Sequence, residues 1–122
     1  MFGFGVYGLI FTKSLRKNFQ FRYVYNYGKS VASKNLILFV KKNNLSVNRI
    51  GICVSKKIGK SHIRNRITRL IREGYRLNEM LFCRGFDIVF VAKKGVLDSD
   101  FFDVKNSVIK LLRAHGLLLN KK

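Results

Sequence analysis

Cysteine is scarce in this chain, and proline and tryptophan are absent from it. The two cysteines, Cys53 and Cys83, occur in a chain with no convincing export signal, which indicates a reduced, cytoplasmic protein. Combined with His62 and His115 they would supply a set of metal ligands, but no pair has the short spacing of a zinc site. We therefore predict no metal site, and we interpret Cys53, which lies inside an apolar run, as a small buried side chain.

Acidic residues are also few, with 6 Asp and Glu in the 122 residues. A nuclease acting alone would need clustered carboxylates for Mg²⁺ or a positioned acid–base pair. The acidic cluster Asp98, Asp100 and Asp103 stands at the start of a predicted helix, where carboxylates serve as caps. His62 has no obvious carboxylate partner, and no nucleophile motif or glycine-rich nucleotide loop is present. We therefore predict no catalytic side chain in this protein.

Linkers and internal repeats are missing too, so one domain is expected from 122 residues that are 48% hydrophobic. The apolar segment 1–11 has no preceding basic residue and no small-x-small cleavage pattern, and it is too short to span a bilayer. We predict a poorly ordered extension, or a loosely packed edge, over 1–12. A single domain follows over 13–118, with a basic tail over 119–122.

Basic residues, by contrast, are abundant: 25 Lys and Arg give a formal net charge of +19. Such a charge opposes folding by self-repulsion unless a polyanion neutralises it. Membrane anchors usually confine their cations to one amphipathic segment, whereas here cations run from Lys13 to Lys122. Nucleic acid is therefore the expected partner, and a membrane surface is not.

The densest basic segment is predicted to be a helix that Ser61 caps and that runs to about Asn78. Apolar residues at 63, 67, 70 and 71 have the spacing of one buried helix face, and Glu73 is placed to pair with Arg69. Arg64 and Arg66, two positions apart, point about 200° away from each other. Cations on two flanks suit a large folded RNA better than one DNA groove, so we expect no DNA partner. The alternative is that these charges only solvate the protein.

The remaining pattern predicts a helix, two strands, the basic helix, a strand and a last helix, which makes an α/β sandwich. The first helix covers 19–27, with Asn18 as its cap and Gly28 as its stop. The strands cover 36–42, 49–55 and 86–92. The last helix starts at Asp98, Ser99 or Asp100 and ends before Gly116.

Two features are in excess of what a core needs. Aromatic residues at 19, 21, 23, 25 and 27 cannot all be buried on one stripe of a short helix, so we divide them between core and binding surface. Strand 36–42 is apolar on both faces, so one face is either buried or covered by something that comes and goes. If strand 49–55 pairs with it, Gly51 and Cys53 leave a groove beside Ile37 and Phe39.

These residues carry a specific resemblance. Segments 54–59 (VSKKIG) and 64–72 (RNRITRLIR) resemble the signature of the bacterial ribonuclease P protein component, whose hallmark is an Arg-Asn-Arg motif in a basic helix. The similarity extends over about 15–118 and includes 21–25 (FRYVY), 28–30 (GKS) and 87–94 (DIVFVAKK).

The resemblance implies an α+β fold like the second domain of ribosomal protein S5, with a left-handed βαβ crossover through the basic helix. Sequence rules alone would favour a right-handed one. It also implies a protein cofactor of an RNA enzyme that removes the 5′ leader of precursor tRNA. The RNA subunit would carry the hydrolysis, with Mg²⁺ held mainly by RNA and substrate. A ribosomal or general RNA-binding protein is the alternative.

The resemblance further implies two sets of binding residues. The catalytic RNA would contact Lys56, Lys57, Lys60, Arg64, Asn65, Arg66, Arg69 and Arg72. A cleft for the single-stranded leader would be lined by Phe21, Tyr25, Ile37, Phe39 and Lys93. A general RNA-binding protein would share the charge but would not need this cleft.

Overall fold

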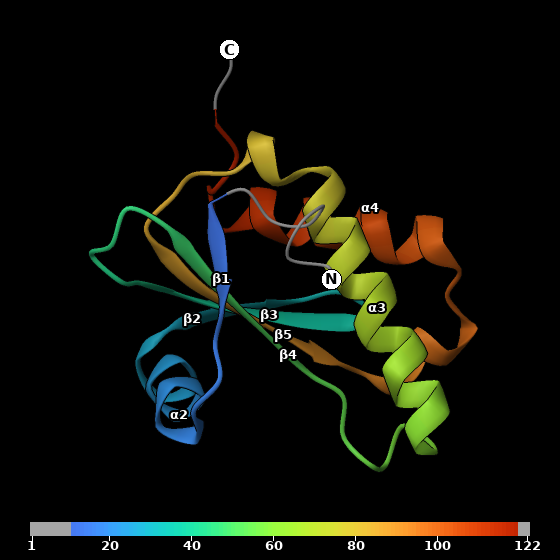
Figure 1. The fold of residues 1–122 in the computed structure, drawn as a ribbon. Coiled ribbons are helices and arrows are strands. Elements are labelled where there is room, and N and C mark those ends of the chain that lie inside the picture. Colours follow the sequence, from blue (N-terminus) through green and yellow to red (C-terminus); the bar gives the residue numbers. More distant parts are fainter. Residues whose placement is uncertain (1–10, 120–122) are drawn as a thin grey trace.

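The structure, a computed structural model, describes residues 11–119, and Figure 1 shows their arrangement. At its centre these residues form a five-stranded mixed sheet in the order β1-β4-β5-β3-β2. β1, β4 and β5 run parallel, and β3 is antiparallel to both β5 and β2. The strands are β1 (Thr12–Ser14), β2 (Lys29–Ala32), β3 (Leu36–Lys42), β4 (Asn48–Cys53) and β5 (Phe86–Ala92).

Helices cover the two faces of the sheet unequally. Among residues 11–119, helices α3 (Ser61–Leu77) and α4 (Phe101–Ala114) pack on one face, and α2 (Asn18–Tyr27) covers part of the other, as Figure 1 shows. Short 3-10 helices, η1 (Glu79–Leu81) and η2 (Lys94–Asp98), follow α3 and β5. This confirms the α+β sandwich predicted from the sequence, with its second sheet face only partly covered.

Apolar side chains of β3 alternate between the two faces of the sheet and pack in both helix layers. Leu36, Leu38 and Val40 are buried in the large core under α3 and α4, while Ile37 and Phe39 lie half-buried on the α2 face. A smaller cluster forms under α2 around Leu15, Val24 and Val89. The two-faced apolar pattern of 36–42 thus reflects a strand with a helix layer on each side.

The basic helix connects two parallel neighbours. β4 and β5 pair in parallel, and α3 lies between them in the chain. Ile67 and Ile71 of α3 are buried against the sheet, as the apolar spacing predicted. The βαβ crossover is therefore confirmed, and its left-handed sense stays a prediction.

Several local predictions were wrong. The residues that cap α2 and α3 are Lys17 and Lys60, because the helices begin at Asn18 and Ser61 themselves. Lys17 donates its backbone N–H to Gln20 Oε1, at 3.2 Å. Of the three caps considered for α4, Asp100 is the one found.

Ion pairing and element bounds also differ from expectation. Glu73 pairs with Arg76, whose Nε lies 2.8 Å from its Oε1, rather than with Arg69. The strand predicted over 49–55 runs from Asn48 to Cys53, and the short elements β1, β2, η1 and η2 were not predicted. They lack the length that gives a readable hydrophobic period.

The folded domain begins before residue 13. Phe11 and Thr12 are buried, and both bond to the buried carboxylate of Glu79: the Phe11 N–H at 3.0 Å and the Thr12 hydroxyl at 2.5 Å. The last two residues of the predicted extension over 1–12 therefore pack on the domain. Segments 1–10 and 120–122 of the predicted extension and tail lie outside the described residues.

Candidate RNA-binding surfaces

The cations predicted to contact RNA lie on one loop and one helix. Lys56, Lys57 and Lys60 are exposed in the loop between β4 and α3. On α3, Asn65, Arg66 and Arg69 are exposed, whereas Arg64 and Arg72 are half-buried. We call this set the α3 cation surface.

Two arginines of this surface are held by the protein itself. Arg64 donates from Nε to the Gly59 carbonyl, at 3.1 Å, which fixes its position at the start of α3. Burial lowers the pKa of the Arg72 guanidinium below its usual value. The Arg72 guanidinium remains cationic at neutral pH, because an arginine pKa starts far above 7. The surface therefore presents a dense positive charge on either side of the buried stripe.

A groove opens between α3 and the beginning of α4. It has a volume of about 580 Å³, and Leu70 of α3 and Phe101 of α4 are its apolar walls. The other lining residues are Arg66, Arg69, Arg72 and Glu73. The side chain of Phe101 is half-buried at this groove.

Three of the residues predicted to line the leader cleft lie together on the opposite face of the sheet. The ring of Tyr25 meets that of Phe39 edge-on with centroids 5.0 Å apart, and Phe21 lies 6.4 Å from Tyr25. The Tyr25 hydroxyl and Cys53 Sγ are hydrogen-bonded at 2.9 Å. Burial, together with this bond, raises the pKa of the Tyr25 hydroxyl, so the group stays neutral.

The pairing assumed for the cleft floor was wrong. β5 lies between β3 and β4, so Val89 and Val91 separate Phe39 and Ile37 from Gly51 and Cys53. Gly51 does not leave an empty groove either, because the Phe21 ring fills the space where a Cβ would be. Because Gly51 has no side chain, α2 can pack closely on the sheet at this point.

The other two predicted cleft residues lie at one end of this surface. Ile37 is half-buried and pairs with Val91 across β3 and β5. Lys93, just after β5, donates from Nζ to the Ser33 carbonyl at 2.9 Å. The structure thus brings Phe21, Tyr25 and Phe39 into contact and leaves Ile37 and Lys93 beside them.

The aromatic residues of α2 divide between a flank that faces the sheet and a flank that is exposed, and the binding role predicted for some of them stays a prediction. Phe21 and Tyr25 face the sheet, while Phe19, Tyr23 and Tyr27 are exposed by 60%, 50% and 66%. Tyr23 and Tyr27 contact each other, with ring centroids 5.0 Å apart. The spacing of the aromatic residues predicted that they divide, but it did not predict which rings face the sheet.

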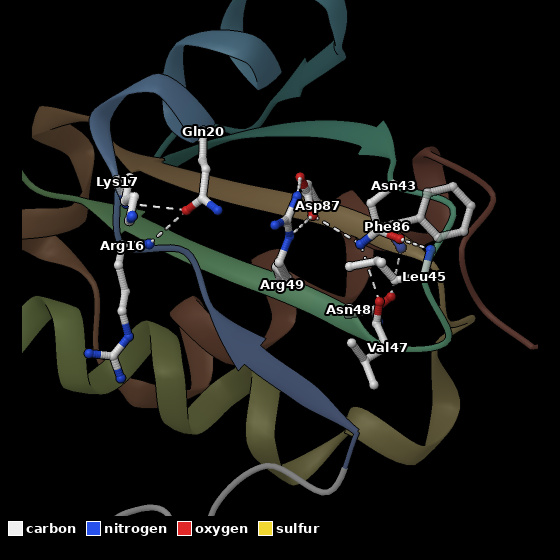
Figure 2. Close-up of polar contacts among 10 residues, drawn as sticks. All are labelled: Arg16, Lys17, Gln20, Asn43, Leu45, Val47, Asn48, Arg49, Phe86 and Asp87. Carbon is white, nitrogen blue, oxygen red and sulfur yellow. Dashed lines mark hydrogen bonds and ion pairs between the residues drawn. The ribbon is translucent and has the colours of Figure 1, made fainter.

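A charged pair that sequence reasoning missed lies on the α2 face of the sheet (Figure 2). Arg49 Nε and Nη2 donate to the two carboxylate oxygens of Asp87 at 2.8 and 2.7 Å, and Asn43 donates to Oδ1 at 2.9 Å. The hydrogen bond to Asp87 raises the pKa of Arg49. Because Arg49 and Asp87 are register partners on β4 and β5, the pair ties the two strands together.

Residues 11–119 contain neither a cluster of metal ligands nor a membrane-spanning helix. No three His, Cys, Asp or Glu side chains in this range form a group that could hold a metal ion. Asp100 instead accepts the backbone N–H of Asp103 at 2.8 Å, and Asp103 accepts that of Asp100 at 3.1 Å. No helix in the same range is long and apolar enough to cross a membrane.

Known proteins share this sequence and this arrangement. The ribonuclease P protein component of Clostridium botulinum (strain 657 / Type Ba4) is 47% identical over 104 residues, which cover 84% of this chain and 94% of the relative. That of Thermoanaerobacter sp. (strain X514) is 46% identical over 98 residues, with coverages of 80% and 84%. The family model described as Ribonuclease P matches residues 11–116. The chain belongs to the ribonuclease P protein family.

Solved ribonuclease P proteins also share the fold. The protein from Staphylococcus aureus superposes with a TM-score of 0.80 at 29% identity, covering 86% of this chain and 96% of that one. The protein from Thermotoga maritima gives a TM-score of 0.78 at 31% identity, with coverages of 84% and 96%. The resemblance read from the Arg-Asn-Arg segment is thereby confirmed.

The resemblance to ribonuclease P proteins predicted the α3 cation surface and the leader cleft, but it did not predict a groove at Leu70 and Phe101. Leu70 was predicted to belong to the apolar stripe of the basic helix, and Phe101 directly follows the predicted cap of the last helix. Nothing in either periodicity reports how closely two helices approach. Their shared groove is a result of the tertiary structure.

Proposed function

We propose that this chain, as the protein component of ribonuclease P in tRNA 5′ processing, binds two RNAs at once. The α3 cation surface binds the catalytic RNA subunit, and the cleft between α2 and the sheet binds the single-stranded 5′ leader of precursor tRNA. The observation that carries this proposal is their placement: α3 packs on one face of the sheet, and the cleft rings lie on the other.

The α3 cation surface suits a structured RNA. Its arginines can donate two parallel hydrogen bonds to a phosphate, and its flanks present them in different directions. Binding of this kind releases condensed counterions, so it weakens as salt is raised. The buried Ile67 and Ile71 hold the helix to the core and leave the cations outside.

The cleft suits an unpaired strand. Aromatic rings stack on any base, and a leader of variable sequence requires contacts that do not depend on base identity. Phe39, Tyr25 and Phe21 supply such rings on a surface that cations border, among them Lys93. A neutral Tyr25 hydroxyl also avoids repulsion of the leader's phosphates.

We further propose that hydrolysis belongs to the RNA subunit and that Mg²⁺ is held mainly by RNA and substrate. The residues present do not fit a Mg²⁺ site made by this chain, because the carboxylates of Asp100 and Asp103 are used as helix caps. Within this assembly the protein supplies binding and positioning. Because its cysteines Cys53 and Cys83 are both free, we place this function in the reducing cytoplasm.

Cleavage of precursor tRNA by the cognate RNA subunit tests this function. At low Mg²⁺, addition of the protein is expected to increase the rate of 5′ leader removal, because protein cations replace part of the Mg²⁺ that screens the two RNAs. The protein without the RNA subunit is expected to cleave nothing. Cleavage by the protein alone would contradict the cofactor role, and a rate unchanged by the protein would leave only a general RNA-binding protein.

A further inference from the structure

The groove between α3 and α4 has apolar walls, which phosphate binding alone does not require. A helix that only contacts backbone phosphates needs an exposed row of cations. Here Arg66 and Arg69 border a hollow of about 580 Å³ whose walls include Leu70 and the ring of Phe101. Apolar walls contribute favourable binding free energy only when an apolar group enters and displaces water from them.

The size and chemistry of the groove limit its occupant. Its volume is within the range of roughly 300–1,000 Å³ typical of pockets for small organic ligands, which includes a single nucleotide. The bases of a continuous RNA duplex are stacked inside the helix, so a duplex offers only phosphates and sugars to such a hollow. An unpaired, unstacked base can enter it, because its flat face packs on an aromatic ring.

The charges around the groove favour binding of the phosphate that belongs to such an unpaired base. Glu73 also lines the groove, but its carboxylate pairs with Arg76 at 2.8 Å. Asp100 and Asp103, at the start of α4, accept backbone N–H groups in the helix cap. Arg66 and Arg69 are exposed, so they can turn toward an anion at the rim.

We propose that this groove holds one unpaired nucleotide of the catalytic RNA subunit. Its base packs between Leu70 and Phe101, and its phosphate is bound by Arg66 and Arg69. The assignment rests on the proposed function, in which the α3 cation surface contacts the catalytic RNA. The groove is part of that surface and lies across the sheet from the leader cleft, so the substrate leader is not its occupant.

Reconstitution of the protein with its RNA subunit provides the first test. Phe101→Ala is expected to weaken binding by roughly 5- to 150-fold, the range for loss of one base–aromatic stack. The slope of log affinity against log salt should not change, because no charge is removed. Phe102→Ala is the matched control: it removes the adjacent ring on α4, which is 67% exposed and does not line the groove.

A second variant separates stacking from folding. Phe101→Leu keeps an apolar side chain at the groove but removes the ring, and it is expected to weaken binding while leaving the thermal unfolding midpoint near that of the unaltered protein. Equal affinities for Phe101→Leu and the unaltered protein would overturn stacking on this ring.

Base-specific chemical modification of the RNA identifies the nucleotide. One unpaired base is expected to be protected by the unaltered protein and by Phe102→Ala, and to become reactive again with Phe101→Ala. Identical patterns with all three proteins would overturn the groove proposal. If the unaltered protein still accelerates leader cleavage in that case, only this inference fails; if it neither binds the RNA nor accelerates cleavage, the proposed function fails.

Discussion

At the scale of single residues, Gly51 decides how the cleft is built. An added Cβ would lie 2.6 Å from Phe21 Cζ, so only glycine lets this ring reach the sheet. The ring then stands beside Tyr25, whose hydroxyl is held by Cys53. Phe21 is therefore a packing residue and, in the proposed function, also a cleft wall, so an experiment must separate these two roles.

The packing role and the leader-binding role of Phe21 can be separated by measuring how Phe21→Ala binds precursor tRNA and mature tRNA. Loss of one stacking ring is expected to weaken binding of leader-bearing precursor tRNA by about 1–3 kcal/mol, while binding of mature tRNA changes little. Any general loss of folded protein affects both substrates equally, so the difference in affinity reports the leader contact. Phe19→Ala, which removes a 60% exposed ring from the other flank of α2, serves as the control. Equal losses for both substrates with Phe21→Ala would assign the residue to packing alone.

At the scale of elements, α3 combines a core face with a binding face. Ile67, Ile71 and Tyr75 are buried, while the arginines between them remain at the surface. The bond from Arg64 to the Gly59 carbonyl links the binding face to the loop that carries Lys56 and Lys57. In the proposed function, loop and helix therefore present their cations together to the catalytic RNA.

The double variant Arg64→Ala with Arg66→Ala tests this surface through its salt dependence. If each arginine contacts one phosphate, the slope of log affinity against log salt should fall by roughly 1.5 in magnitude, since each contact contributes about 0.7–0.9. Fluorescence titrations of the RNA subunit over a range of salt concentrations measure the slope. A double variant with the same loss of charge elsewhere, Arg22→Ala with Arg113→Ala, should leave it nearly unchanged. An unchanged slope for the Arg64 and Arg66 variant would exclude phosphate contacts at those positions.

At the scale of the whole molecule, the sheet separates the two binding surfaces that we propose, and both depend on positive charge. The net charge of +19 favours binding of a polyanion, and the same charge repels itself in the free protein. Internal compensation is limited: Arg49 with Asp87 and Arg76 with Glu73 are the ion pairs found in residues 11–119. The folded state is therefore expected to depend on its ionic surroundings.

Thermal unfolding in different salts tests this expectation. Inorganic phosphate or sulfate is expected to raise the unfolding midpoint more than sodium chloride of equal ionic strength, because multivalent anions bind the clustered arginines of the folded state. A gain of about 1 kcal/mol would raise the midpoint by about 4 °C in a domain of this size. Calorimetry measures the shift, and a midpoint that does not respond to salt would contradict the expected self-repulsion.

Local sequence determined the elements whose side chains repeat with a clear period. Strands 36–42 and 86–92 occur with the predicted bounds, and the buried face of α3 follows the spacing of Ile63, Ile67 and Ile71. The Arg-Asn-Arg segment also identified the family, because a motif of charged residues at fixed spacing depends on the order of residues alone. Prediction of helix caps was less secure, since Lys17 and Lys60 reach their cap positions without the usual side chains.

Tertiary structure decided what depends on residues distant in the chain. Only the strand order places β5 between β3 and β4, and only the packing of α2 puts Phe21 over Gly51. The groove at Leu70 and Phe101 likewise exists because two helices that are separate in sequence approach each other. A hydrophobic period shows which side of an element is buried, but the shape of a binding surface depends on which elements meet there.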